Sequence, residues 1–203
     1  MALEFVKRPE TAISRLGVLP GTFNPPTRAH LALAHAALAH CDEIVFVLPR
    51  ALPHKDYGGV GFHERLQLLA GAVASHPQFA AAASGGGLFL EIAAECREAY
   101  GSDVEIAFLC GRDAAERIVG WKYEREEMLA EMFEQFSLLV ARRQGEYAAP
   151  PHLVSRIRCL EIAEGWDAVS ATEVRERIAA GLAWQDLVPP AIAAEVARVY
   201  GKI

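Results

Sequence analysis

The stretch GTFNPPTRAH, residues 21–30, joins a short apolar run to a run of strong helix formers. The apolar run at 16–19 predicts a buried strand, and residues 31–38 predict a helix. Gly21 has no Cβ, so a backbone or a ligand can approach it closely. The two prolines that follow stop the strand from continuing. The sequence therefore predicts a strand, a tight loop and a helix in succession.

Thr27 and His30 fall in the first turn of the expected helix, three residues apart and on one face. This turn has free backbone N–H groups and the positive end of the helix dipole, so it suits a phosphate group. A Thr-x-x-His pair alone is more often an N-cap followed by a surface or core histidine. The pair is therefore a candidate site only in its wider context.

Composition limits the function classes. The chain has 203 residues, of which 52% are hydrophobic and 23% charged, as expected of a globular protein. A net charge of −6 argues against sequence-independent binding of nucleic acid. The four cysteines form no C-x-x-C pair, which argues against a zinc site and favours reduced thiols in a cytoplasmic protein. No apolar run approaches the length of about 18 residues that a membrane span requires.

The remaining pattern alternates strands with helices. We expect further strands at 44–48, 104–110, 136–141 and 158–162. We expect helices at 27–40, 62–75, 88–100, 128–134, 170–181 and 190–200, and a short one ending near residue 120. Residues 1–13 are expected to form a loose extension, and no element is predicted for 79–87. This order predicts an α/β fold with a Rossmann-like, doubly wound parallel sheet in one domain, 1–203, whose small helical part begins near residue 170.

Two segments after expected strands carry polar side chains. The loop at 49–61 holds Arg50, His54 and Lys55, and loops of this length often carry function. Asp113 follows the strand expected at 104–110, and ligands of open α/β sheets collect at the carboxyl ends of strands. Asp113 either accepts hydrogen bonds from ribose hydroxyls or is an ordinary helix N-cap.

Residues 170–175, with the sequence SATEVR, open a later helix. Ser170 with Glu173 forms a capping box, which would by itself explain the pattern. Thr172 and Arg175 would nevertheless be able to reach a triphosphate, and the guanidinium offers two parallel hydrogen bonds that lysine lacks.

The string at 21–30 resembles the G-x-F-x-P-x-[HT]-x-x-H signature of the nucleotidylyltransferase superfamily, with Ala29 where the common form has glycine. Further segments resemble, in the same order, those of nicotinate or nicotinamide mononucleotide adenylyltransferases: Pro-His-Lys at 53–55, G-x-D followed by tryptophan at 111–121, residues 170–175, and Leu-Val-Pro at 187–189. The resemblance covers the chain from about residue 15.

The resemblance implies that the 5′-phosphate of an acceptor attacks the α-phosphorus of ATP and displaces pyrophosphate, with Mg²⁺ carried by ATP and no protein-bound metal. The catalytic residues would be His30, Thr27, Lys55 and Arg175. ATP would be bound by Gly21, Thr22, Phe23, Thr27, His30, Gly111, Asp113, Ser170, Thr172 and Arg175. The acceptor would be bound by Asn24, His54, Lys55, Trp121 and Arg142, with the indole stacked on the pyridine ring.

One departure leaves the acceptor open, because Gly87-Leu88-Phe89 stands where bacterial members carry Ser-Tyr-Thr. The alternatives are a nucleotidyltransferase that uses CTP or another phosphorylated acceptor, and a catalytically silent nucleotide-binding protein. A dinucleotide-dependent oxidoreductase ranks last, because no G-x-G-x-x-G follows the first strand. The expected partners are small molecules and a second copy of the chain, with no nucleic acid and no membrane.

Overall fold

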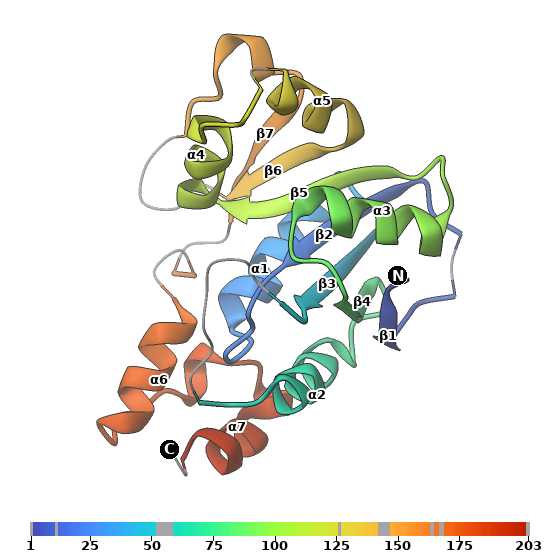
Figure 1. The fold of residues 1–203 in the computed structure, drawn as a ribbon. Coiled ribbons are helices and arrows are strands. Elements are labelled where there is room, and N and C mark those ends of the chain that lie inside the picture. The colour runs from blue at the N-terminus through green and yellow to red at the C-terminus, as the bar shows by residue number, and fades with distance from the viewer. Residues whose placement is uncertain are drawn as a thin grey trace.

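A computed structural model describes residues 2–10, 12–51, 59–125, 127–141, 147–162, 165–166 and 169–201. Seven strands form one sheet in the order β1-β4-β3-β2-β5-β6-β7 (Figure 1). All neighbouring strands are parallel except β1, which runs antiparallel to β4. The strands are β1 Glu4–Lys7, β2 Arg15–Pro20, β3 Glu43–Pro49, β4 Phe79–Ser84, β5 Glu105–Gly111, β6 Ser137–Ala141 and β7 Ile157–Leu160.

Helices cover both faces of this sheet (Figure 1). They are α1 Arg28–Ala37, α2 Phe62–Val73, α3 Phe89–Tyr100, α4 Arg112–Gly120, α5 Met128–Gln135, α6 Ala171–Ala179 and α7 Ala193–Tyr200. Short 3₁₀ turns occur at Pro151–Leu153, Gln185–Leu187 and Pro190–Ile192. The expected α/β class, with a mostly parallel sheet and helices at the C-terminus, is confirmed.

Successive side chains of the central strands enter different hydrophobic cores. Val45 and Val47 pack in the core that α3 and α5 cover, whereas Ile44 and Phe46 pack in the core that α1 and α2 cover. All seven residues of β3 are buried. This is why the strand has a continuous apolar sequence rather than an alternating one.

Two sequence expectations are wrong at one edge of the sheet. Residues 1–13 are not a loose extension throughout, since β1 pairs with β4, and residues 79–84 form the fully buried strand β4. The sequence of β4 is Phe-Ala-Ala-Ala-Ala-Ser, and alanine favours helix over strand when it is judged locally. Packing between two helical layers overrides that preference, because small side chains fit where the layers approach closely.

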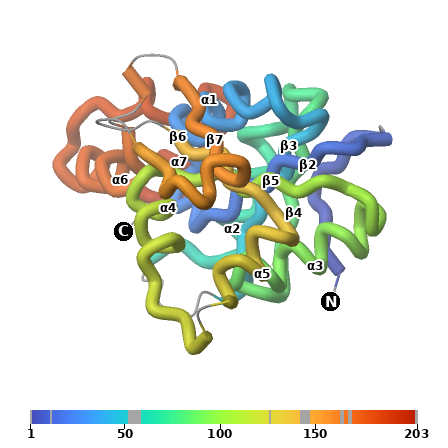
Figure 2. Tube along the Cα trace, turned by 90° about the horizontal axis from the view of Figure 1, so that it is seen from above, coloured from blue at the N-terminus to red at the C-terminus, as the bar shows by residue number. Residues whose placement is uncertain are grey.

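The C-terminal helices form a third hydrophobic cluster against α2. Val174 of α6 and Val196 of α7 pack there with Leu68, and Val188 is fully buried. Viewed from above, α6 and α7 lie on the side of the molecule away from β1 (Figure 2). The C-terminal segment is thus attached to the sheet through α2.

Candidate active site

The candidate site lies where the order of the strands reverses. β2 pairs with β3 on one side and with β5 on the other, and Val18 lies opposite Phe108 in the register with β5. The loop at 21–27 follows β2, and Gly111 is both the end of β5 and the N-cap of α4. Two of the predicted motifs therefore meet at the carboxyl ends of β2 and β5, which is the position where open α/β sheets bind ligands.

Thr27 and His30 interact directly at the start of α1. Thr27 is the N-cap and is fully buried, and its backbone N–H donates to Nδ1 of His30 at 3.0 Å. The Thr27 Oγ1 lies 2.8 Å from the same nitrogen. Because a backbone N–H can only donate, Nδ1 is an acceptor, and in the neutral ring Nε2 carries the proton. His30 is therefore oriented to donate a hydrogen bond from Nε2.

Phe23 fixes the His30 ring from a second direction. The two ring centroids are 5.2 Å apart in an edge-to-face arrangement, and Phe23 also packs on Phe46 at 5.9 Å. Phe23 has a φ of 43°, which is rare for a residue with a bulky side chain. Such strain persists only where the surroundings hold it, and it clusters at functional loops.

Gly21 serves this aromatic packing. A Cβ at Gly21 would come within 3.0 Å of the Phe23 ring. The sequence predicted that Gly21 permits close approach of a backbone or ligand, and in the structure an aromatic side chain makes that approach. A side chain at this position would therefore crowd the Phe23 ring.

Three side chains from distant helices hold the loop. Arg65 of α2 donates to the carbonyl of Thr22 at 2.8 Å, and Arg175 of α6 donates to the carbonyl of Asn24 at 2.6 Å. The hydroxyl of Tyr200, in α7, donates to Oδ1 of Asn24 at 2.6 Å. Arg65 and Tyr200 are buried, and burial raises the pKa of the Tyr200 hydroxyl, which stays protonated as a donor. The C-terminal helices are therefore connected to the loop by hydrogen bonds.

The start of α6 has the serine half of the predicted capping box. Ser170 is the N-cap and accepts a hydrogen bond from the backbone of Glu173 at 3.1 Å. Arg175 also donates to the carbonyl of Ala171 at 3.1 Å and to Oγ1 of Thr172 at 3.2 Å. The guanidinium is therefore held between α6 and the loop, and its positive charge lies beside Asn24.

The other predicted residues are less closely connected to this loop. Asp113 lies exposed in the first turn of α4, and the N-cap there is Gly111, so the alternative that Asp113 is the N-cap is wrong. Trp121 follows α4 directly and is 55% exposed. His54, Lys55 and Arg142 lie outside the described residues.

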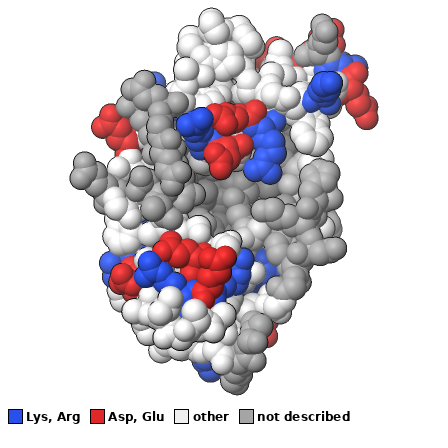
Figure 3. All heavy atoms as spheres, turned by 90° about the vertical axis from the view of Figure 1, so that its left-hand side faces the viewer, with Lys and Arg blue, Asp and Glu red and all other residues white. Residues whose placement is uncertain are grey.

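Figure 3 shows the side of the molecule on which α4 and α6 lie in Figure 1, with two separate groups of charged side chains that each contain both signs. Among the described residues, no group of three or more His, Cys, Asp or Glu side chains is arranged to hold a metal ion. Within the same residues, no helix is both long and apolar enough to cross a membrane.

Sequence reasoning missed two residues that shape the loop. Arg65, in α2, is not among the candidate residues that the sequence indicates, and in the structure it has a definite partner in the carbonyl of Thr22. Tyr200 carried no signal, because it lies 176 residues from its partner Asn24. Taken together, the site offers a fixed imidazole donor, a helix N-terminus and a guanidinium. These groups suit the positioning of phosphates and the stabilisation of their charge.

Comparisons with known proteins agree with this geometry. The sequence model of the family described as cytidylyltransferase-like matches residues 18–177. A protein from Gloeobacter violaceus named probable nicotinate-nucleotide adenylyltransferase is 30% identical, covering 86% of this chain and 89% of its own length. A protein of the same name from Moorella thermoacetica is 30% identical, covering 94% and 90%.

A solved structure has the same fold. It is that of nicotinic acid mononucleotide adenylyltransferase from Plasmodium falciparum complexed with NaAD, with a TM-score of 0.71 and 14% identity, covering 92% of this chain and 97% of that one. The resemblance derived from the motifs is thereby confirmed. The chain belongs to the cytidylyltransferase-like family of nucleotidyltransferases.

Proposed function

We propose that this protein transfers the adenylyl group of ATP to the 5′-phosphate of nicotinate mononucleotide, or of its amide, as a step of NAD biosynthesis. An oxygen of the acceptor phosphate forms a bond to the α-phosphorus, and the bond from that phosphorus to the pyrophosphate leaving group breaks. The observation that carries this proposal is the His30 ring at the start of α1, where Nδ1 accepts from the Thr27 N–H, so that Nε2 of the neutral ring carries the proton. The names of the relatives support the choice of substrates.

The chemistry needs no protein nucleophile, so the proposed roles are positioning and charge stabilisation. His30, beside Thr27, would donate to the α-phosphate, while Arg175 and Lys55 would offset the charge of the β- and γ-phosphates. The proposed ATP site also contains Gly21, Thr22, Phe23, Gly111, Asp113, Ser170 and Thr172. The proposed acceptor site consists of Asn24, His54, Lys55, Trp121 and Arg142.

The divalent metal proposed for this reaction is Mg²⁺. Magnesium prefers phosphate and water oxygens, and few carboxylates suffice for it. The site geometry fits this, since the described residues around the loop at 21–27 offer a guanidinium and an imidazole rather than a carboxylate cluster. The phosphates of ATP would hold the ion, which would neutralise part of their charge.

We also propose that residues 1–203 form a single nucleotidyltransferase domain that acts in the cytoplasm and binds no nucleic acid. The hydrogen bonds from Arg175 and Tyr200 to Asn24 support the inclusion of the C-terminal helices in the ATP site. A homo-oligomer is proposed from the sequence alone.

A structural detail favours a second candidate, transfer to another phosphorylated acceptor. Phe89 stacks on Phe108 with centroids 4.5 Å apart and rings nearly parallel at 6°. The Glu91 carboxylate accepts from the backbone N–H groups of Gly87 and Leu88 at 2.8 and 3.0 Å. The segment at 87–89 therefore offers no side-chain hydroxyl, and the backbone N–H groups of Gly87 and Leu88 are engaged.

The test is pyrophosphate release with ATP or CTP and a panel of acceptors that includes both pyridine mononucleotides. We expect turnover with ATP and nicotinate mononucleotide, and His30→Ala should lower kcat by about 10²-fold or more. The matched control is His152→Ala, because His152 is exposed in the turn Pro151–Leu153. Near wild-type kcat in His30→Ala would refute the assigned role, and turnover only with other acceptors would favour the second candidate.

A further inference from the structure

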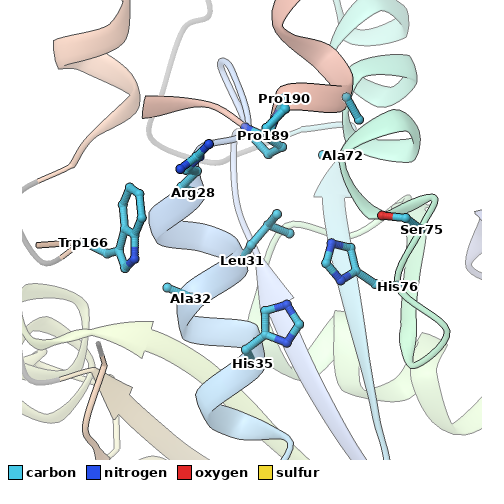
Figure 4. A pocket seen from close by; sticks show the side chains of 11 residues that line it. Arg28, Leu31, Ala32, His35, Ala72, Ser75, His76, Trp166, Pro189 and Pro190 are labelled. Atoms are coloured by element: carbon cyan, nitrogen blue, oxygen red, sulfur yellow. The ribbon is translucent and has the colours of Figure 1, made fainter. Parts of the chain in front are cut away.

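A groove separate from the candidate active site lies on the outer side of α1 (Figure 4). One wall is a stripe of α1 formed by Arg28, Leu31, Ala32 and His35, spaced at i, i+3, i+4 and i+7. His30 lies on a different face of the helix, because each residue turns the helix by about 100°. The groove and the proposed phosphate site therefore use opposite sides of α1.

The groove is large enough for a small ligand. Ala72, Ser75 and His76 form the opposite wall, and Trp166 with Pro189–Ala191 forms one end. Its volume is about 500 Å³, within the range typical of ligand pockets. Figure 4 shows Trp166 and Arg28 close together at one end and the rings of His35 and His76 at the other.

Arg28 gives this groove its charge. Its Nε donates to the carbonyl of Val188 at 3.3 Å, and its guanidinium carbon lies 5.4 Å from the centre of the Trp166 ring. No ion pair joins Arg28 to a carboxylate in the part of the chain that the structure describes. No Asp or Glu is among the described lining residues, although the chain as a whole carries −6. The guanidinium is therefore placed to bind an anion.

The rest of the lining is apolar or aromatic. Leu31, Ala32 and Ala72 line the two walls with apolar side chains, and Trp166 offers a ring for stacking. At the far end the His35 and His76 rings are 4.9 Å apart, edge to face, and both pack on Phe79. Burial lowers the pKa of His76, so its ring is neutral near pH 7 and Arg28 supplies the positive charge. A ligand that matches this lining has a flat apolar body and a single negative group.

We propose that the groove between α1 and α2 is a binding site for a small aromatic carboxylate. The carboxylate pairs with the Arg28 guanidinium, and the ring lies against Trp166 and the apolar walls. This occupant gives the Arg28 guanidinium a negative partner and covers the apolar surface at once. A neutral aromatic compound would satisfy only the second, and a cation would be repelled by Arg28.

Calorimetry on the full chain with 1-naphthoate tests the proposal. We expect binding that is about tenfold or more weaker in Arg28→Met, the effect of losing one charge-assisted hydrogen bond. Arg198→Met is the control, because Arg198 is exposed on α7 and paired with Glu195. The neutral analogue 1-naphthalenemethanol should bind about tenfold more weakly than the acid.

A second variant, Ala32→Trp, keeps the charge of Arg28 and fills the groove with a large side chain. Ala32→Trp should abolish naphthoate binding while thermal unfolding shows that the chain still folds. Binding should be unchanged in Trp121→Ala and at saturating ATP, since those changes affect only the proposed active site. Absence of naphthoate binding at millimolar concentration, equal affinity for acid and alcohol, or competition by ATP would each overturn the proposal.

Discussion

Tyr200→Phe removes a single hydroxyl that connects the last helix to the loop at 21–27. The hydroxyl donates to Oδ1 of Asn24 at 2.6 Å, and Tyr200 is 5% exposed. Phenylalanine keeps the ring and its packing against Val196 and the rest of the C-terminal cluster. The change therefore tests the hydrogen bond with little effect on the hydrophobic core.

The expected loss of stability follows from that one contact. A hydrogen bond makes a net contribution of about 1 kcal/mol to the free energy of unfolding, and a buried acceptor left without a partner costs about 1–3 kcal/mol. Asn24 is half-buried, so water can partly replace the donor, and we expect a destabilisation of about 1–2 kcal/mol. For a chain of about 200 residues, this corresponds to a Tm lowered by about 2–8 °C.

Activity should fall as well, because Asn24 lies three residues before Thr27 and small displacements of positioned groups reduce rate strongly. The assay is kcat and KM for ATP by pyrophosphate release, alongside thermal unfolding. Tyr147→Phe is the matched control, since the Tyr147 hydroxyl is buried and has no hydrogen-bond partner among the described residues. Equal effects of the two variants on Tm and kcat would refute the reasoning, and a lowered Tm with unchanged kcat would show that Tyr200 does not position the loop.

Three further changes have defined outcomes. Arg175→Lys should raise KM for ATP, because lysine keeps the charge but loses the fork that also bonds Asn24, and an unchanged KM would assign Arg175 to the loop alone. Burial raises the pKa of Glu43, so the wild type loses stability as pH rises above about 4. Glu43→Gln removes this titration, so the gain in Tm that it gives should grow from pH 5 to pH 8, and a gain independent of pH would contradict the prediction. The Arg15 guanidinium and backbone N–H lower the pKa of Asp42 to about 2. In acid unfolding curves, the destabilisation by Asp42→Asn should therefore be full at pH 6 and shrink between about pH 4 and 2. A difference in stability between wild type and variant that stays constant with pH would contradict this.

The sequence by itself determined the elements whose signals are local. The run at 16–19, the prolines and the helix formers after Thr27 predict strand, loop and helix, because each residue favours its own backbone conformation. Ser170 with Glu173 likewise predicts a helix start, and the cap is present in the structure. The family is determined in the same way, since its motifs are short and contiguous.

Tertiary structure alone decided the pairings over long distances. β4 is a strand because two helical layers bury its alanines, against their local preference. Arg65 and Tyr200 meet the loop at 21–27 only through the packing of α2 and α7. The groove next to Arg28 likewise requires α1, α2 and the segment at 189–191 together. Spacing along a chain specifies which residues share a helix or strand, but contacts between elements depend on how the hydrophobic faces pack.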